Sequence, residues 1–422
     1  MRKKKNAFTL IELLAVIAIL AIILVISIPK ILDVIETSKK YTLKNAVMLI
    51  ADSAEKKYTE NEAFGEENEI TCDSVSKLNK EDYNKCTIIF DENGIAKVSI
   101  LGRGKFKGLK AIEATKTSAE VIKLEAPKYG ITAVEYIKQQ YEYDGDGLKI
   151  DNTKDQNIRY YGSNPNNYVS FNNELWRIIG VFGNNVKLIR NEKLGNLSWD
   201  SSESSVNGGW GVNEWSQSNL KNYLNTMYYG GTSVTCYNGQ NKKEVTCPTN
   251  KLDETSKSLI DKHTWNTGAP LYNRTTKSYD TVEFYKAERG NETGKICSSG
   301  EGCNDTVERT TTWTGYVGLT YITDYAYASG EDDCNTKIDQ SSTDKCKNNN
   351  WMFKNTWYWT LSPAAYSDYD NRVWFVFGAG YTGGNFAAVP LSAFPTIYLK
   401  SNILIDSGTG TSSNPYILKA SA

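Results

Sequence analysis

Residues 8–29 read FTLIELLAVIAILAIILVISIP, and the seven residues before them read MRKKKNA. From Leu13 to Ile28 only Ser27 interrupts the apolar run. A helix over the 22 residues that end at Pro29 is long enough to span a bilayer core of about 30 Å. Basic residues are retained on the cytoplasmic side, which places the C-terminus outside. A secretory signal peptide fits less well, because the apolar run is longer than a usual h-region and no small-x-small cleavage site follows it.

The run contains one carboxylate, Glu12, at the edge of the expected hydrocarbon zone. A carboxylate there is costly unless it is paired. If the chain is cut before Phe8, the new α-amino group is a cation that can pair with Glu12 of a neighbouring subunit, in a register that the low dielectric enforces. The alternative is that Glu12 reaches the cytoplasmic headgroups.

The whole segment, KKKNA-FTLIELLAVIAILAIILVISIP, resembles the cleavage and methylation motif of type IV pilins and pseudopilins. Phe8 is the first mature residue in that pattern, Glu12 the fifth and Pro29 the twenty-second, whereas Ala7 stands where the family usually has glycine. The resemblance implies that a prepilin peptidase cuts between Ala7 and Phe8 and that Phe8 is N-methylated. It also implies that the helix, with Glu12, assembles into a filament or pseudopilus.

The helix is expected to continue beyond Pro29, which would kink it or loosen one turn. Apolar residues recur in steps of three and four, the spacing of an amphipathic helix, at Leu43, Ala46, Val47, Ile50, Ala54 and Tyr58. Such a stripe packs more often on its own domain than on a partner. We therefore predict a helix over residues 8–60, transmembrane over 8–29, with its second half covered by the strands that follow.

Residues 71–116 contain two β-rich runs around Glu92-Asn93-Gly94, a strong hairpin signal. They predict a small pilin-like antiparallel head over residues 61–120. The glycines and lysines of residues 102–110 lack a phosphate-binding fingerprint, which favours a solvated turn. The Lys- and Glu-rich residues 121–156 are expected to form a linker. Asp144, Asp146 and Asp151 offer oxygens to calcium, but no closing glutamate follows, so a turn is the default reading.

Residues 157–422 predict an irregular α+β domain. The run NELWRIIGVFGNNVKLIRNE indicates a hairpin about residues 183–185, and residues 219–229 and 251–262 indicate short amphipathic helices. This region is similar to an uncharacterised domain of bacterial surface and pilin-like proteins, through that run and through WSQSNLKNYLN, GLTYITDYAYA, WYWTLSP and PTIYLKSNILIDSGTGTSSNPYIL. The resemblance suggests a C-type-lectin-like or sulfatase-modifying-enzyme-like fold. No calcium-sugar motif is visible, so sugar binding is not carried over.

Eight cysteines follow the helix, and they form four near neighbours in sequence order. Gaps of 14, 11, 6 and 12 residues suit local disulfide loops in an oxidising, external location. None of these pairs has the spacing of a zinc site, and His263 is the only histidine. The candidate disulfide residues are Cys72, Cys86, Cys236, Cys247, Cys297, Cys303, Cys334 and Cys346.

The sequence shows no catalytic constellation. A Gly-x-Ser-x-Gly elbow is absent, and His263 is the only possible histidine base, so we expect it to be a surface or packing residue and expect no enzyme activity, cofactor or metal site. Aromatic clusters at residues 351–359 and 374–381 are expected to be core strands. Trp210 and Trp215, in polar loops, are the better candidates for an exposed ligand-binding surface.

These observations favour an α+β filament subunit, a minor or tip pilin, anchored in the membrane and displayed outside for adhesion or ligand capture. Its expected partners are other pilin subunits, prepilin peptidase, the membrane and an extracellular ligand. Without its four N-terminal basic residues the chain has 44 basic against 49 acidic residues, which disfavours nucleic acid. The alternatives are a membrane-tethered extracellular enzyme or binding protein, and a pseudopilin of a secretion or DNA-uptake system.

Overall fold

The protein is described here from a computed structural model, in which the chain divides into two compact units. The first comprises the described residues up to Ala126 together with Glu142–Asp144, and the second comprises Pro127–Tyr141 and the described residues from Gly145 onward. The described residues are 10–65, 69–76, 78–202, 208–270, 280–290, 309–330, 334, 338, 344–365 and 370–421.

The first unit is built on one long helix, α1 (Leu10–Phe64), which continues through Pro29. It ends four residues beyond the predicted end at residue 60. Its C-terminal half buries one stripe, formed by Leu43, Val47, Ile50, Ala51 and Ala54, as the spacing predicted. The amphipathic half of the helix therefore packs on its own domain.

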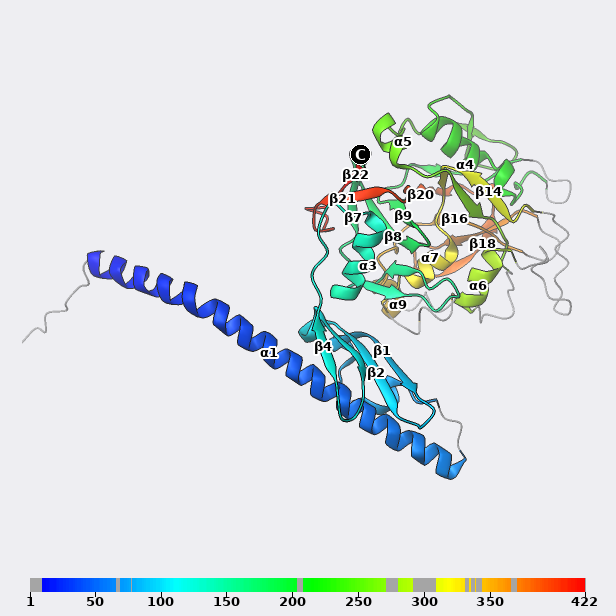
Figure 1. Cartoon of the computed structure of the whole chain (residues 1–422). Coiled ribbons are helices and arrows are strands. Elements are labelled where there is room, and N and C mark those ends of the chain that lie inside the picture. Colours follow the sequence, from blue (N-terminus) through cyan, green and yellow to red (C-terminus); the bar gives the residue numbers. More distant parts are fainter. Residues whose placement is uncertain are drawn as a thin grey trace, which may run out of the picture. The chain divides into compact units, whose positions relative to one another are not determined.

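The partner of that stripe is a four-stranded antiparallel sheet in the order β1-β2-β3-β4 (Figure 1). Buried side chains of β2 and β3, among them Val98, Ile100 and Ala111, close the core against the helix. β1 and β2 form the predicted hairpin. Around the sheet lie short helical turns, and the elements of this head are α2 (Cys72–Val75), η1 (Lys80–Asp82), β1 (Tyr83–Phe90), β2 (Ala96–Gly102), η2 (Gly104–Phe106), β3 (Leu109–Ala114) and β4 (Glu120–Lys123).

The predicted linker over residues 121–156 is wrong. Its first residues belong to β4, and the chain then forms α3 (Ala133–Tyr143) and β5 (Leu148–Ile150). α3 buries Ala133, Tyr136, Ile137 and Tyr141, which are spaced three and four residues apart. Intervening lysines and glutamates mask this stripe, so a charged composition alone was misleading. The second unit accordingly begins at Pro127 rather than at residue 157.

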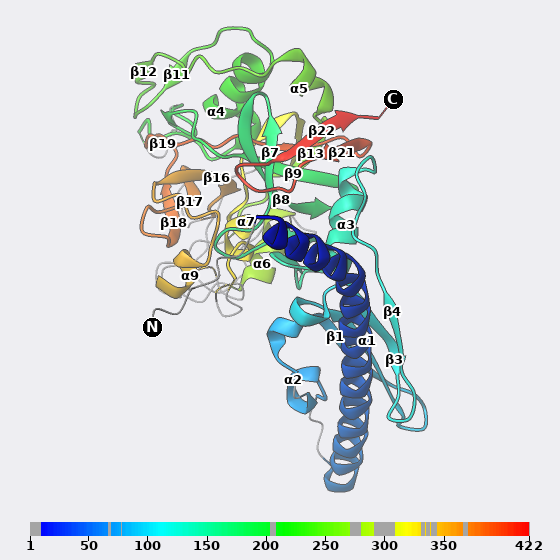
Figure 2. The same cartoon turned by 90° about the vertical axis from the view of Figure 1, so that its left-hand side faces the viewer.

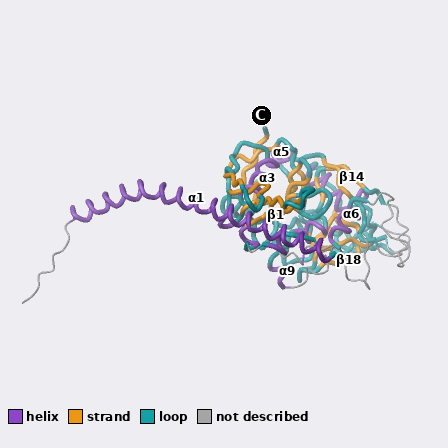
Figure 3. The backbone as a smooth tube through the Cα atoms, turned by 60° about the horizontal axis from the view of Figure 1, so that its bottom comes forward, coloured by secondary structure: helices purple, strands orange, loops and turns teal. Residues whose placement is uncertain are grey.

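The second unit mixes short helices with many strands, which confirms the predicted α+β class (Figure 3). Predicted helices at 219–229 and 251–262 occur in shorter or altered form, the first as an α-turn followed by a π-helix. Besides α3, the helices in the described residues of this unit are η3 (Trp215–Gln217), α4 (Asn219–Asn222), η4 (Tyr223–Tyr229), α5 (Glu254–Leu259), α6 (Thr281–Glu288), α7 (Ile322–Tyr327) and α9 (Asp344–Asn348).

Besides the pairs β11-β12 and β13-β14, which form two separate two-stranded sheets, two larger sheets contain most of the described strands of this unit. One follows the order β15-β20-β9-β8-β7-β22-β21, with β6 also paired to β8 and β5 to β6. The other follows β10-β19-β16-β17-β18. The strands are β6 (Ile158–Tyr160), β7 (Tyr168–Phe171), β8 (Glu174–Phe182), β9 (Asn185–Arg190), β10 (Asn196–Leu197), β11 (Cys236–Tyr237), β12 (Glu244–Val245), β13 (His263–Asn266), β14 (Thr312–Gly315), β15 (Val317–Gly318), β16 (Tyr358–Pro363), β17 (Arg372–Val376), β18 (Thr382–Phe386), β19 (Leu391–Ser392), β20 (Thr396–Tyr398), β21 (Ile403–Ser407) and β22 (Tyr416–Ala420).

The strands β8 and β9 lie next to each other at the centre of the first of these sheets (Figure 2). They form the predicted hairpin, which turns at Gly183. Gly183 has φ +58°, a backbone conformation that favours glycine. On β8, six consecutive residues from Trp176 to Val181 are buried, which shows that both faces of this strand are covered. Two of the residues in this hairpin, Arg177 and Lys187, are charged, and they lead to the sites described next.

Candidate functional site

The N-terminal half of α1 has the length and composition of a membrane span. Every described side chain from Leu10 to Val25 is exposed, Glu12 among them. Ala7 and Phe8, the predicted cleavage and methylation residues, lie outside the described residues. The cleavage, the methylation, the pairing of Glu12 and the kink at Pro29 remain predictions.

Three of the predicted local disulfides are formed. They join Cys72 to Cys86, Cys236 to Cys247 and Cys334 to Cys346. Cys297 and Cys303 lie outside the described residues. The three bridges are local loops of 14, 11 and 12 residues, so each constrains its own segment of the chain rather than linking distant elements.

The placement of Trp215 on an exposed surface is wrong. Its side chain is fully buried and packs against Trp199 and Trp313, with ring centroids 5.2 and 5.9 Å away. The polar neighbours that suggested exposure are buried too: Asn213 donates to two backbone carbonyls, and Glu214 accepts hydrogen bonds from Thr310. Polar residues that are internally hydrogen-bonded can thus surround a core tryptophan.

Trp210 is partly exposed and lies against Phe386, with ring centroids 4.8 Å apart. Its role in ligand binding remains a prediction. The aromatic clusters at 351–359 and 374–381 are mostly core, as expected, but Trp357 and Tyr381 are 46% and 39% exposed. Both rings contact Phe377, and together they form a small, partly exposed aromatic cluster next to strands β16 and β17.

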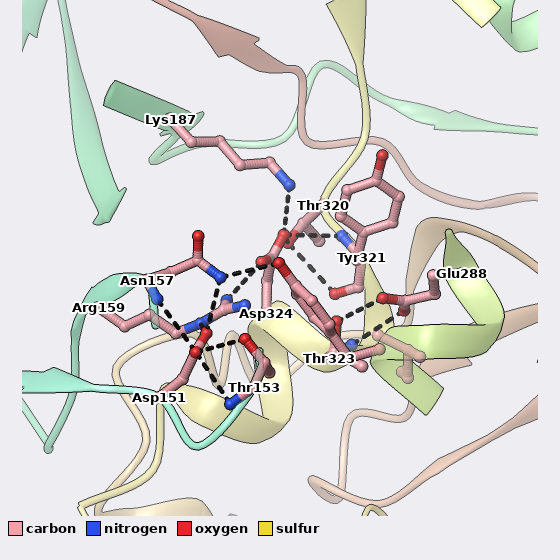
Figure 4. A network of polar contacts seen from close by, with 12 residues as sticks. Asp151, Thr153, Asn157, Arg159, Lys187, Glu288, Thr320, Tyr321, Thr323 and Asp324 are labelled. Atoms are coloured by element: carbon pink, nitrogen blue, oxygen red, sulfur yellow. Dashed lines mark hydrogen bonds and ion pairs between the residues drawn. The ribbon is translucent and has the colours of Figure 1, made fainter. Parts of the chain in front are cut away.

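A network of buried charges occupies the interior of the second unit (Figure 4). Arg159 on β6 is at its centre: Nε donates to Asp151 Oδ2 at 2.6 Å, and an Nη donates to Asp324 Oδ1 at 2.7 Å. Lys187 on β9 donates to Asp324 Oδ2 at 2.5 Å. We call these four residues the Asp324 network. Their side chains are at most 1% exposed.

Both carboxylates of the Asp324 network also accept hydrogen bonds from neutral donors. The hydroxyl of Thr153 and the side-chain amide of Asn157 donate to Asp151, and the backbone N–H of Tyr321 donates to Asp324. Lys187 and Arg159 hold the pKa of Asp324 down, to about 2, against the opposing effect of burial. Two cations face two carboxylates, so the network carries no net charge when all four are ionised. Asp151 is therefore committed to Arg159, which explains its burial without calcium.

Glu288, the last residue of α6, lies beside this network. It accepts hydrogen bonds from the Thr323 hydroxyl at 2.5 Å and from the Ser362 hydroxyl at 2.9 Å. Burial raises its pKa to about 7, although Arg289 opposes the shift. Glu288 and the Asp324 network are closed to solvent, and this arrangement suits a structural role in joining β6, β9, α6 and α7 better than catalysis.

A second pair of cations lies in a surface cavity of about 640 Å³. We call this cavity the Arg177 pocket. Arg177 on β8 is 4% exposed and lies over the rings of Tyr168 and Trp351, at 4.2 and 4.5 Å from their centroids. Its Nε donates to Asn167 Oδ1 at 2.8 Å, and an Nη donates to the Pro165 carbonyl at 3.3 Å.

Lys354 lines the same pocket. Its Nζ donates to the backbone carbonyl and the side-chain Oδ1 of Asn191, both at 3.3 Å. Burial and the nearby charge of Arg177 lower the pKa of Lys354 to about 8, although the carboxylate of Glu192 opposes the shift. Within the described part of the chain, neither Arg177 nor Lys354 forms an ion pair with a carboxylate. This pocket therefore holds two cations whose hydrogen-bond acceptors are all neutral.

His263 packs inside the second unit. Its ring stacks on Tyr398 with centroids 3.7 Å apart, and Nδ1 lies 3.1 Å from Asp261 Oδ2. Burial lowers its pKa. This is the packing role expected from the sequence, and the contacts account for the residue without a catalytic partner.

Sequence reasoning missed the charged residues of both sites. Arg159, Arg177 and Lys187 each stand within an apolar strand, in the runs NIRYY, LWRII and NVKLI. A cation inside a strand that is buried on both faces requires either a buried carboxylate or another anion. That signal was present, but the runs served only to predict strands.

Comparison with known protein families matched residues 2–28 to the prokaryotic N-terminal methylation motif. Searches among curated proteins and among solved structures found no match. The motif marks the chain as a type IV pilin-like precursor, and it implies processing by prepilin peptidase and assembly with other pilin subunits. The C-type-lectin-like fold suggested for the second unit remains a prediction.

Proposed function

We propose that this pilin-like precursor becomes a minor or tip subunit of a surface filament, where its second unit captures an external ligand by binding rather than by catalysis. The observation that carries the proposal is the contrast along α1. The C-terminal half of the helix buries its apolar stripe on the head, whereas the apolar N-terminal half is left uncovered within the described residues. An apolar surface of that extent requires a membrane or neighbouring subunits.

Support for a minor or tip position comes from the size of the second unit. It spans most of the chain from Pro127 onward, and a unit of this bulk is difficult to accommodate at every position of a packed fibre. Support for binding rather than catalysis comes from the second unit itself. Its most perturbed described carboxylates, Asp324 and Glu288, are closed to solvent, whereas one of its open cavities, the Arg177 pocket, holds cations.

The test is mass spectrometry of the N-terminal peptide from a sheared surface-filament fraction. We expect a peptide that begins at methylated Phe8, with this chain forming a small minority of the filament subunits. An intact Met1 start confined to membranes would overturn the filament proposal and favour a membrane-tethered protein. A stoichiometry equal to that of the most abundant subunit would overturn the minor or tip assignment.

The role of Glu12 is tested in the same fraction. We expect Glu12→Ala to remove the chain from sheared filaments while leaving it in the membrane, because the paired cation of a neighbouring subunit would lose its partner. Glu60→Ala is the matched control, since Glu60 lies on the same helix in an exposed position. Equal incorporation of both variants would show that Glu12 is not an assembly residue.

A further inference from the structure

The Arg177 pocket differs from an ordinary surface hollow in its charge. Four basic residues line it, and Glu192 is the only acidic residue among its described lining residues. Lys193 and Lys347 accompany Arg177 and Lys354 in the lining. Lys347 is engaged by Asp344 at 2.6 Å, and Glu192 accepts a hydrogen bond from Asn191 at 2.9 Å. The lining therefore carries more positive than negative charge, even with Lys347 paired to Asp344 and with Glu192 opposing one further cation.

Without a bound anion, the positions of Arg177 and Lys354 in the pocket destabilise the folded state. Arg177 is held in place between two aromatic rings and is bonded only to neutral oxygens. Lys354 is close enough to Arg177 for the two charges to repel each other. Partly desolvated like charges without a counter-ion destabilise a fold. Elsewhere in the same unit, the buried cations Arg159 and Lys187 are paired with two carboxylates. Arg177 and Lys354 have no such ion pairs within the described residues.

An oxyanion placed between the two side chains would remove this cost. The guanidinium is a planar donor fork that matches a carboxylate or phosphate, and an ammonium adds a compact point charge. The rest of the lining is mainly polar and aromatic, with side chains such as Asn164, Asn348 and Phe353. Amides and aromatic rings suit a ligand that carries hydroxyl groups as well as charge.

We propose that the Arg177 pocket binds the oxyanion group of a small hydroxylated ligand, such as an acidic sugar, through Arg177 and Lys354. This inference rests on the proposed function of the second unit in ligand capture, and it names the chemical class of the ligand. A carboxylate and a phosphate share the required chemistry, and the experiment distinguishes the two.

Isothermal titration calorimetry of the full chain in detergent micelles, in chloride buffer, tests the proposal with three probes. They are glucuronate, inorganic phosphate and uncharged glucose. We expect saturable binding of at least one of the two anions and none of glucose under the same conditions. Binding of glucuronate alone identifies a carboxylate site, and binding of phosphate alone identifies a phosphate site. Failure of both anions, or equal binding of glucose, would overturn the proposal.

Two lysine variants test whether anion binding depends on the Arg177 pocket or only on the overall charge of the chain. Lys354→Met is expected to weaken anion binding at least tenfold, whereas Lys419→Met, which removes an exposed lysine of β22, leaves it unchanged. Lys354 is partly exposed, so its replacement is compatible with folding, whereas Arg177→Met also removes a ring-packed side chain. Unchanged binding by a folded Lys354→Met chain would overturn the assignment. If the chain assembles into filaments but binds neither anion, only the proposal for the Arg177 pocket is refuted. If it binds an anion but is never found in filaments, only the filament proposal is refuted.

Discussion

Two pairs of cations in the second unit have opposite surroundings. Arg159 and Lys187 form ion pairs with two carboxylates in the closed interior, whereas Arg177 and Lys354, in an open cavity, donate hydrogen bonds only to neutral oxygens. Both pairs stand on or beside the same central sheet, so the difference does not come from the kind of scaffold. We infer from this contrast that a cation paired with carboxylates inside the chain has a structural role, whereas a cation without such a pair is a candidate for ligand binding.

The largest expected effect comes from breaking the compensated pair. Asp324→Ala leaves Arg159 and Lys187 buried without one of their carboxylates, and we expect a loss of about 3–5 kcal/mol of unfolding free energy. Denaturant unfolding followed by tryptophan fluorescence measures it, because all ten tryptophans lie in the second unit, between Trp176 and Trp374. Asp406→Ala, at an exposed position, is the matched control, expected to change stability by less than about 0.5 kcal/mol. Similar stabilities for the two variants would refute the structural role of the network.

The next effect concerns Glu288 and pH. Its folded pKa, about 7, lies above the usual 4.5, so the folded state holds a proton that the unfolded state has lost over that range. The contribution of Glu288 to stability is therefore fully present below pH 4.5 and is lost as the pH rises through 7, with a total on the order of 3 kcal/mol.

Glu288→Gln removes this titration and isolates it from that of other groups, such as His263. The measured quantity is the difference between the unfolding free energies of the two chains at each pH from 4 to 8. We expect the variant to gain relative to the wild type as the pH rises, whatever constant offset the amide introduces. Parallel curves would show that the pKa of Glu288 is the same in the folded and unfolded states, which would contradict the prediction.

The smallest expected effect concerns the second pair of cations, Arg177 and Lys354. Lys354→Met removes one of two neighbouring like charges, and we expect stability in the absence of ligand to rise by about 1 kcal/mol, a modest value because the side chain is partly exposed and Glu192 offsets part of the repulsion. The same fluorescence measurement applies, with Lys419→Met as control. A loss as large as that of Asp324→Ala would mean that Lys354 has a compensating partner, and the contrast between the two cation pairs would fail.

Local sequence patterns predicted the local structure well. The spacing of Leu43, Val47 and Ile50 predicted the buried stripe of α1, and turn residues predicted the β1–β2 and β8–β9 hairpins. Close cysteines predicted three of the disulfides that the structure contains. These features depend on residues near one another in the chain, and for that reason periodicity and spacing suffice to predict them.

Sequence failed where burial depends on distant segments. α3 was hidden by its charged residues, and Trp215 was predicted to be exposed because its neighbours are polar. Those neighbours are satisfied by partners about a hundred or more positions away, such as Thr310 for Glu214 and the Ala364 carbonyl for Asn213. Composition reports the polarity of a residue, but only its partners decide whether it is buried.

The sequence by itself determined the apolar N-terminal helix, the methylation motif and the α+β class, because each is written in contiguous residues. Only the tertiary structure decided which of the cations are paired with carboxylates. Arg159 and Lys187 meet Asp324 from more than a hundred residues away, and Arg177 lies near Lys354 across a similar separation. A charge is neutralised by what folding brings within a few ångströms of it, and no local pattern records which cation will find a carboxylate and which will not.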